Sequence, residues 1–145
     1  MKKMLFGLLV LVSLCFIGCD LSPAVADVSV VNNTDYTFVF MADYNHSLKT
    51  SSSVKTVGPN STVHVSCEGI YTKSQVDDFG DDFYFYYSEL GEWEDLKNNS
   101  ASGVSECYLL TNDANQMSLS NKYSQKYTVT FEMQNGNVVT EIVSH

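Results

Sequence analysis

The clearest pattern of hydrophobic and polar positions lies at the end of the chain. From residue 127 to residue 133, apolar side chains occupy every second position, and threonine or glutamate fills the positions between them. Alternation with a period of two is typical of a β-strand with one buried face. Asn135-Gly136 follows, and residues 138–143 form a second run rich in β-branched side chains. Because Asn-Gly is a strongly favoured two-residue turn between such runs, we predict a β-hairpin here.

Two more β-branched and aromatic runs lie between residues 28 and 42, separated by Asn32-Asn33-Thr34-Asp35. The polar turn residues between the runs indicate a second hairpin. In the later run both sets of alternating positions are largely apolar, with aromatic side chains at 36, 38 and 40 and aliphatic ones at 39 and 41. A strand of this kind is expected in a sheet that packs against other layers on both of its faces.

The middle of the chain contains shorter and less regular segments. Residues 54–67 are predicted to form a strand, a turn at Gly58-Pro59-Asn60 and a second strand. Residues 83–87 read as an aromatic strand. A short helix is predicted near residues 88–97, with Ser88 as its N-cap, because apolar side chains then recur at every third position.

With a further strand predicted at residues 105–111, the chain contains seven or eight short strands and one short helix. This pattern favours an all-β fold, an antiparallel β-sandwich of about 7–8 strands. The run VVNNTDYTFVF, followed by VGPNST, resembles small Ig-like or transthyretin-like domains of cell envelopes. That resemblance implies the same two-sheet architecture.

The N-terminus has a different character. Two lysines at positions 2 and 3 precede an uncharged, mostly apolar run from Met4 to Ile17. A charged start followed by ~7–15 apolar residues indicates a secretory signal. The run is shorter than the ~20 apolar residues that a membrane-spanning helix needs.

The run ends in Phe16-Ile17-Gly18-Cys19, which resembles the lipobox of bacterial lipoproteins, a small residue followed by a cysteine. The resemblance implies that the Cys19 thiol receives a diacylglycerol, that the chain is cut just before it, and that fatty acyl chains such as palmitate are attached. Residues 1–18 would then be the lipoprotein signal peptide, residues 19–26 the lipidated cysteine with a short tether, and residues 27–145 the β-sandwich domain. The expected location is the bacterial cell envelope, anchored by lipid at the periplasmic face or the cell surface.

A conventional signal peptide is the alternative. The segment PAVAD contains an A-x-A-like site, and cleavage there would follow Ala24 or Ala26. The two readings differ by a covalent anchor, since two or three acyl chains hold a protein stably on a membrane.

Charge restricts the partners. After residue 18 the chain has six lysines, no arginine and seventeen acidic residues, a formal charge of −11. No basic stripe exists for nucleic acid. The domain would also be repelled by an anionic lipid surface, so the lipid must supply the membrane attachment. An envelope protein or a glycan is the expected partner.

The cysteines separate into two groups under this reading. Cys15 would leave with the signal peptide and Cys19 would carry lipid, so Cys67 and Cys107 remain. An even pair in an oxidising compartment favours a disulfide. Closure of a loop of about 40 residues would contribute roughly 4 kcal/mol in the chain-entropy model. Two buried reduced thiols are the alternative.

The acidic and aromatic segment 77–93 is the candidate ligand surface. An EF-hand that starts at Asp78 fails because Phe83 falls where the loop needs glycine. A calcium site of another kind stays open, as do a glycan or small-ligand surface and the plain alternative of a solvated turn beside a fully covered strand. The candidate residues are Asp77, Asp78, Asp81, Asp82, Tyr84, Tyr86 and Trp93.

We find no motif for catalysis, metal or cofactor. His64-x-x-Cys67 has a metal-like spacing, but residues three apart in a strand point to opposite faces. Ser100 to Gly103 resembles the S-x-S-G loop of small lipoprotein inhibitors of lysozyme. We therefore predict a non-enzymatic, lipid-anchored envelope protein that binds or scaffolds a partner. The alternatives are a small-ligand, glycan or calcium module using residues 77–93, and an inhibitor of a lysozyme-type hydrolase.

Overall fold

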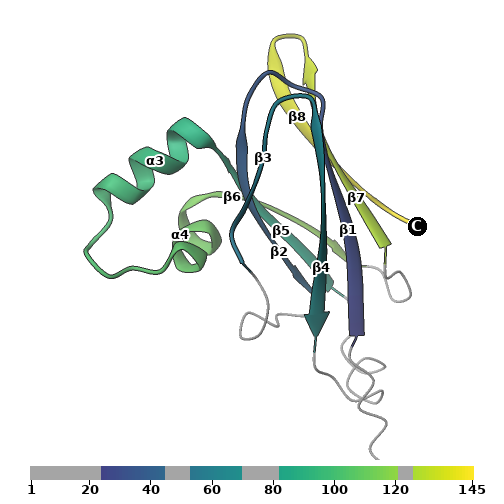
Figure 1. The fold of residues 1–145 in the computed structure, drawn as a ribbon, viewed down its shortest axis with the longest axis horizontal. Coiled ribbons are helices and arrows are strands. Elements are labelled where there is room, and N and C mark those ends of the chain that lie inside the picture. The colour runs from purple at the N-terminus through teal and green to yellow at the C-terminus, as the bar shows by residue number, and fades with distance from the viewer. Residues whose placement is uncertain (1–23, 45–52, 70–81, 121–125) are drawn as a thin grey trace, which may run out of the picture.

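The computed structural model describes residues 24–44, 53–69, 82–120 and 126–145. In these ranges eight strands and two helices follow one another along the chain (Figure 1). Their bounds are β1 Ala24–Asn32, β2 Phe38–Tyr44, β3 Lys55–Val57, β4 Ser61–Gly69, β5 Asp82–Glu89, α3 Leu90–Asn99, α4 Glu106–Asp113, β6 Asn115–Ser120, β7 Lys126–Gln134 and β8 Asn137–Ser144.

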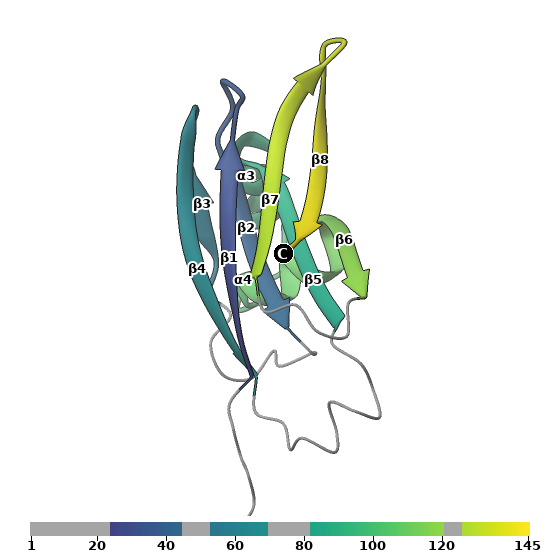
Figure 2. The same ribbon diagram turned by 90° about the vertical axis from the view of Figure 1, so that its right-hand side faces the viewer.

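The strands form two four-stranded sheets that face each other (Figure 2). Sheet A has the order β4-β1-β7-β8, and sheet B has the order β3-β2-β5-β6. Pairing is antiparallel throughout except between β1 and β7, which run parallel. The predicted all-β sandwich of seven or eight strands is confirmed.

Alternation along the strands builds the core between the sheets. Sheet A contributes apolar side chains from β1, β4 and β7, and sheet B contributes aromatic ones from β2 and β5. Two aromatic pairs stack across the gap, with ring centroids 4.1 Å apart for Phe38 and Phe131 and 4.2 Å apart for Phe83 and Tyr127. The buried members are Ala26, Val28, Val30, Phe38, Phe40, Ala42, Val57, Cys67, Phe83, Phe85, Tyr127, Val129 and Phe131.

A second core lies on the other face of sheet B, under the two helices that project to one side in Figure 1. It contains Val39, Met41, Tyr86, Trp93, Leu109 and Leu110. The expected two-sided packing of the strand around residue 40 follows from this arrangement. Its even-numbered side chains enter the inter-sheet core, and Val39 and Met41 enter the second core.

The helix predicted near residues 88–97 is present as α3, but its cap differs from the prediction. Glu89 occupies the N-cap position and makes no side-chain capping bond. Ser88 is buried in β5, where its hydroxyl donates to the Glu89 carbonyl at 3.2 Å. Ser88 is therefore the last alternating residue of the strand rather than the start of the helix.

The strand predicted at residues 105–111 is wrong, because these residues form α4. The Ser105 hydroxyl accepts a hydrogen bond from the Tyr108 N–H at 3.2 Å and caps the helix. Leu109 and Leu110 are both buried in the same core, which adjacent residues of one strand could not be. Packing of this segment against one face of sheet B therefore favours the helix.

The hairpin predicted at Asn32-Asn33-Thr34-Asp35 is also wrong. β1 belongs to sheet A and β2 to sheet B, so the segment is an arch between the two layers. The turn at Gly58-Pro59-Asn60 is a second arch, from β3 in sheet B to β4 in sheet A. Turn residues indicate where a strand ends, whereas the sheet that each strand joins depends on burial across the whole domain.

The Asn135-Gly136 hairpin is confirmed. β7 and β8 pair antiparallel, with Gln134 opposite Asn137. The φ angles of Asn135 and Gly136 are 53° and 82°, as a type I′ turn requires.

Candidate binding pocket

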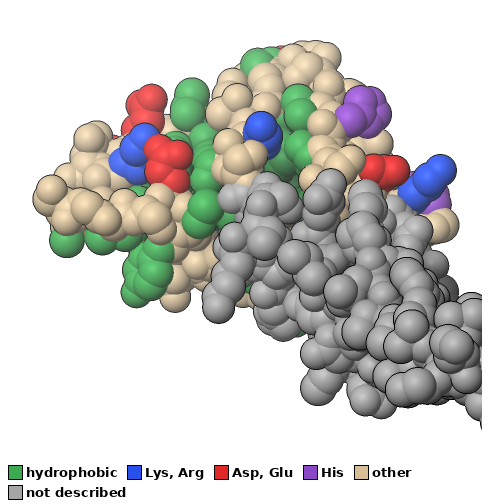
Figure 3. All heavy atoms as spheres, turned by 60° about the horizontal axis from the view of Figure 1, so that its bottom comes forward, with side chains coloured by type: hydrophobic (Ala, Val, Ile, Leu, Met, Phe, Trp, Pro, Cys, Tyr) green, Lys and Arg blue, Asp and Glu red, His purple; other side chains and the backbone are tan. Residues whose placement is uncertain are grey.

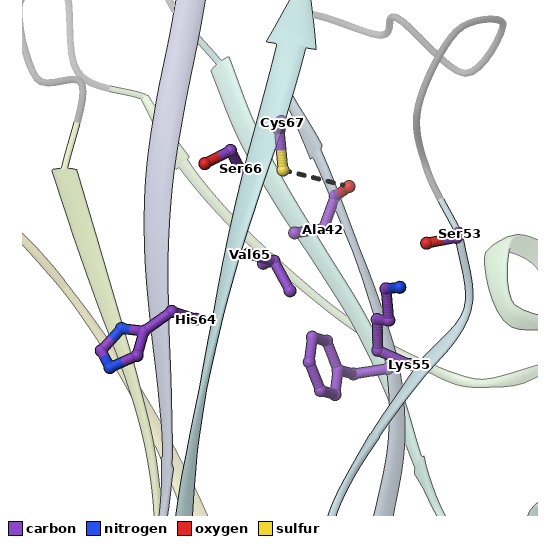
Figure 4. Close-up of a pocket in the computed structure, with 8 residues that line it drawn as sticks. Ala42, Ser53, Lys55, His64, Val65, Ser66 and Cys67 are labelled. Atoms are coloured by element: carbon purple, nitrogen blue, oxygen red, sulfur yellow. Dashed lines mark hydrogen bonds between the residues drawn. The ribbon is translucent and has the colours of Figure 1, made fainter.

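A pocket of about 280 Å³ opens between the sheets, next to β4 of sheet A and to β2 and β3 of sheet B (Figure 4). Because Cys67 on β4 pairs with Ala26, the pocket lies toward the end of the sandwich where β1 begins. It is lined by Phe40, Ala42, Ser53, Lys55, His64, Val65, Ser66 and Cys67.

The pocket exists because β3 is short. It pairs with Phe38 to Phe40 alone, whereas β2 continues to Tyr44. Beside Ala42, sheet B therefore has no β3 residue, and the space between the sheets is reached from the side. The nine-residue strand β4 forms the opposite wall.

Strand alternation decides which side chains enter the pocket. Val65 and Cys67 point into it from β4, and His64 and Ser66 point to the other side of that strand (Figure 4). His64 Nδ1 lies 3.0 Å from the Ser29 hydroxyl, and the Ser66 hydroxyl donates to the Asp27 carboxylate at 2.8 Å. His64 and Ser66 therefore contribute backbone to the wall while their side chains belong to the exposed face of sheet A.

Cys67 contributes its thiol to the lining of the pocket. Its thiol donates a hydrogen bond to the Ala42 carbonyl at 3.5 Å, across the gap between the two sheets (Figure 4). Burial raises the pKa of Cys67 to about 12, and the carboxylates of Asp43 and Asp27 add to this shift. The group is therefore a neutral thiol at physiological pH, which is the opposite of what a nucleophile needs.

Lys55 supplies the charge at the pocket mouth. It lies opposite Phe40 in the β2–β3 ladder and shares the inward side of β3 with Val57, but it is exposed. Figure 4 shows its side chain running along the pocket. Within the described ranges its ammonium group makes no ion pair and no hydrogen bond.

The sequence did not single out Lys55. The available signal was its position two residues before the buried Val57 on the same strand, which places an ammonium group on an inward face at a sheet edge. A long cationic side chain can occupy such a position by keeping its charged end in water.

The predicted disulfide between Cys67 and Cys107 is wrong. No disulfide joins the two residues, both of which lie in the described part of the chain. Cys67 belongs to the core between the sheets, and Cys107 packs against the second core under the helices. Sheet B separates them, whereas a disulfide needs Cα atoms about 4.4–6.8 Å apart.

The predicted ligand surface at residues 77–93 divides into three parts. Asp77, Asp78 and Asp81 lie outside the described residues, and Asp82 begins β5. Cys19, the predicted lipidation site, also lies outside the described residues. Tyr84 is half-buried. Tyr86 and Trp93 are 6% and 4% exposed and belong to the second core, so these two side chains pack under the helices instead of facing a ligand.

The second core also perturbs Tyr86. Burial, followed by the nearby Asp43 carboxylate and Tyr84, raises the pKa of the Tyr86 hydroxyl. The Lys97 ammonium group lies 5.8 Å from the centre of the Trp93 ring and 2.7 Å from Glu106, so it links α3 to α4. These contacts are typical of packing and give no sign of a binding surface.

A groove of about 440 Å³ lies between α3 and the start of β6, and it is lined partly by acidic side chains. In the ranges that the structure covers, no three His, Cys, Asp or Glu side chains lie close enough to hold a metal ion.

The turn predicted to resemble a lysozyme-inhibitor loop, Ser100 to Gly103, joins α3 to α4, and the Ser100 hydroxyl donates to the Lys97 carbonyl at 2.8 Å.

The outer face of sheet A is mixed, with the exposed side chains of Val139 and Val143 beside polar ones. The two described histidines, His64 and His145, are exposed, and Figure 3 shows histidine side chains at the surface. His145 Nε2 lies 2.9 Å from the Thr128 hydroxyl. Neither imidazole faces the pocket interior, so the pocket chemistry depends on Lys55, the thiol and apolar groups.

No model of a known protein family matches the chain, and no curated protein matches its sequence. Among the described residues, neither helix has the length and apolar content that crossing a membrane requires.

Proposed function

We propose that the protein is a lipid-anchored domain of the bacterial cell envelope with a non-enzymatic role, in which it binds or scaffolds another envelope component. The proposal rests on the leader sequence, which ends in Gly18-Cys19, and on the place where the folded domain begins.

The observation that carries the proposal is the start of β1. This strand begins at Ala24, inside the segment expected to be a tether. Ala26 is 0% exposed and pairs with Cys67. Cleavage after Ala26, one of the two alternative signal-peptide sites, would remove three paired residues and one core side chain from the central part of sheet A, whereas cleavage after Ala24, the other site, would remove one paired residue. Cleavage before Cys19 leaves the strand whole.

The same boundary sets the distance from the membrane. Residues 20–23 separate Cys19 from the first paired residue, and four extended residues reach at most about 14 Å. An anchored domain would therefore stand close to the lipid, with the pocket at its membrane-proximal end. An acidic domain held there needs the covalent lipid, because its own charge is repelled by anionic headgroups.

The binding role is supported by the pocket chemistry. The pocket combines polar and apolar side chains, an ammonium group that has no partner among the described residues, and a neutral thiol, a set suited to holding a molecule rather than to transforming it. Because Tyr86 and Trp93 are buried, the alternative module at residues 77–93 would have to rely on the aspartates and Tyr84.

The test is the chemical form of the mature N-terminus. We expect mass spectrometry of the membrane-extracted protein to give a chain that starts at Cys19 with added acyl mass, and expect labelled palmitate to be incorporated. Cys19→Ser should abolish both, whereas the matched control Cys15→Ser should leave both unchanged. A mature chain that starts at Val25 or Asp27 without lipid would refute the proposal.

A further inference from the structure

We propose that β8 is a docking edge for an extended segment of a partner protein, which adds to sheet A as a further strand and places a basic side chain opposite Glu141. The proposal names the kind of partner for the binding role proposed above, on which it rests. It follows from the position of β8 in the sheet, the direction of its backbone groups, its exposed side chains and its charge.

The backbone of β8 is open to pairing on one side. β8 is the last strand of sheet A, with β7 beside it (Figure 2), and its residues pair with β7 one for one, without a bulge. The His145 N–H donates to the Lys126 carbonyl at 2.9 Å, toward β7. Because backbone groups of an antiparallel strand point alternately to its two sides, those of Val138, Thr140 and Ile142 point to the open edge.

β8 is also the edge strand on which large apolar side chains are exposed. Natural edge strands are commonly protected by short length, lysine, proline or a bulge. β3 has three residues and includes Lys55, and no large apolar side chain described on β4 or β6 is exposed. On β8, Val139 and Val143 are 38% and 42% exposed, and the strand contains neither lysine nor proline. Of the described edges, β8 is therefore the one that offers both backbone groups and apolar surface.

Charge on the outer face determines which strand fits. Glu141 lies between Val139 and Val143 on this face of β8, and Glu132 lies opposite Val139 on β7. Both carboxylates are exposed. A residue of the added strand directly opposite Glu141 would have its Cβ about 4.5–5.5 Å away, where an opposite charge stabilises the pair and a like charge destabilises it. The edge therefore selects lysine or arginine at that position, with apolar side chains two residues away on each side.

The inner face of β8 sets the rest of the pattern. Val138 and Ile142 pack against the inter-sheet core but are only partly buried, and Thr140 lies between them. The Thr140 hydroxyl is buried and has no hydrogen-bond partner in the described part of the chain. Threonine opposite threonine is a favourable cross-strand pair. A fitting strand therefore presents apolar, threonine and apolar side chains in turn on its inner face.

A second copy of the chain does not meet these requirements. If residues 138–144 of two copies paired antiparallel, Glu141 would face its own counterpart, and like charges directly opposite destabilise a sheet. The β1 strands of the two copies would also begin at opposite ends of the joined sheet. The nine residues of β1 span about 30 Å, which a tether of at most about 14 Å cannot bridge when both copies are anchored in one membrane. The occupant is therefore a segment of a different protein.

The test measures binding of labelled octapeptides to the full-length protein, extracted from membranes in detergent, by fluorescence anisotropy. The probe Thr-Val-Ile-Lys-Thr-Val-Ile-Thr places its lysine opposite Glu141 when it docks antiparallel. A second probe has glutamate in place of the lysine. Two further probes have N-methyl groups, either on the residues opposite Thr140 and Ile142, whose N–H groups face β8, or on those opposite Val139 and Glu141, whose N–H groups face away.

We expect the lysine probe to bind saturably below about 1 mM and the glutamate probe to bind about two- to ten-fold more weakly. Methyl groups that face β8 should weaken binding by about thirty-fold, because two interstrand hydrogen bonds are lost. Methyl groups that face away should leave the affinity nearly unchanged. Equal binding of the two methylated probes would overturn the proposal, as would the absence of saturation.

Charge variants test the residue assigned to the specificity. Glu141→Lys should reverse the preference, so that the glutamate probe binds more tightly than the lysine probe. Glu94→Lys makes the same change in net charge at an exposed position on α3, and it should keep the preference of the wild type. A reversal in both variants would show that net charge alone selects the probe, against the proposal.

A proline variant tests the edge itself. Thr140→Pro removes an N–H that points away from β7, a position at which edge strands tolerate proline, so it should abolish binding while circular dichroism shows a folded protein. Should this variant unfold, the methylated probes make the same test on the wild type. A dimer of the protein without probe that Thr140→Pro dissociates would assign the edge to a second copy and overturn the proposal. The acyl mass at Cys19, read from the same samples, reports separately on the lipid anchor.

Discussion

Asn32 offers the sharpest test of how the sandwich is held together. It is 1% exposed at the end of β1, where the chain crosses from sheet A to sheet B. Its amide group donates to the carbonyls of Tyr36 at 2.7 Å and Gly58 at 2.8 Å, and its side-chain oxygen accepts from the N–H and the hydroxyl of Thr34 at 3.1 and 2.7 Å. One side chain therefore connects both arches between the sheets.

The expected cost of Asn32→Ala follows from those four contacts. A hydrogen bond contributes ~0.5–1.5 kcal/mol net, and a buried group left without its partner costs ~1–3 kcal/mol. Since the contacts share one small region and are not additive, we expect the free energy of unfolding to fall by about 3–5 kcal/mol. Such a loss is a large part of the ~5–15 kcal/mol stability of an ordinary domain.

Asn32→Asp separates the two kinds of contact. The carboxylate keeps both acceptor contacts with Thr34 but points a negative oxygen at the carbonyls of Tyr36 and Gly58. Folding should therefore raise the pKa of the new carboxyl group above its ordinary ~3.9. The variant should be most stable at low pH, where the group is protonated and can donate, and should lose stability as the pH rises through the folded-state pKa.

The assay is urea unfolding of the wild type, both variants and Asn33→Ala, followed by circular dichroism. Asn33 is the matched control, because its exposed side chain makes one contact, to Glu132 at 3.5 Å, and its loss should cost less than ~0.5 kcal/mol. A cost below ~1 kcal/mol for Asn32→Ala, or equal costs at both positions, would refute the role given to Asn32.

Three further predictions follow from the fold. Gly136→Ala should lower the unfolding free energy by about 1–2 kcal/mol because φ is +82° at this position, whereas Gly91→Ala, which meets open space in α3, should raise it by up to ~1 kcal/mol in the same urea titration. Folding raises the pKa of Cys67 from 9.0 to about 12. The stabilisation of the folded state that this shift provides should be complete below pH 9 and lost between pH 9 and 12, by at most about 4 kcal/mol. Cys67→Ala should flatten this decline, and a reductant should leave the melting temperature unchanged. Trp93, the one tryptophan of the chain, should resist acrylamide quenching until unfolding, and Trp93→Ala should cost about 3–5 kcal/mol by thermal melting.

The candidate site was less accessible to sequence reasoning than the fold. Of the pocket residues, the sequence singles out Cys67 for a disulfide that its position across sheet B from Cys107 does not allow, and His64 for a metal-like spacing to Cys67 that strand alternation opposes. Tyr86 and Trp93 were considered as ligand contacts because aromatic side chains suit both binding surfaces and cores. Only the placement of the two helices over sheet B distinguishes the two roles.

Local pattern by itself determined which residues form most strands, which side chains share a face, and where the Asn135-Gly136 hairpin turns. These properties depend on backbone geometry and on residues one or two positions apart, so a single stretch of sequence contains them. The tertiary structure decided which sheet each strand joins, that residues 106–113 form a helix, and that Asn32, Cys67 and Lys55 occupy an arch, a pocket wall and a pocket mouth. Those outcomes depend on contacts between segments far apart in the chain, because which side chains become buried depends on how all the strands pack together.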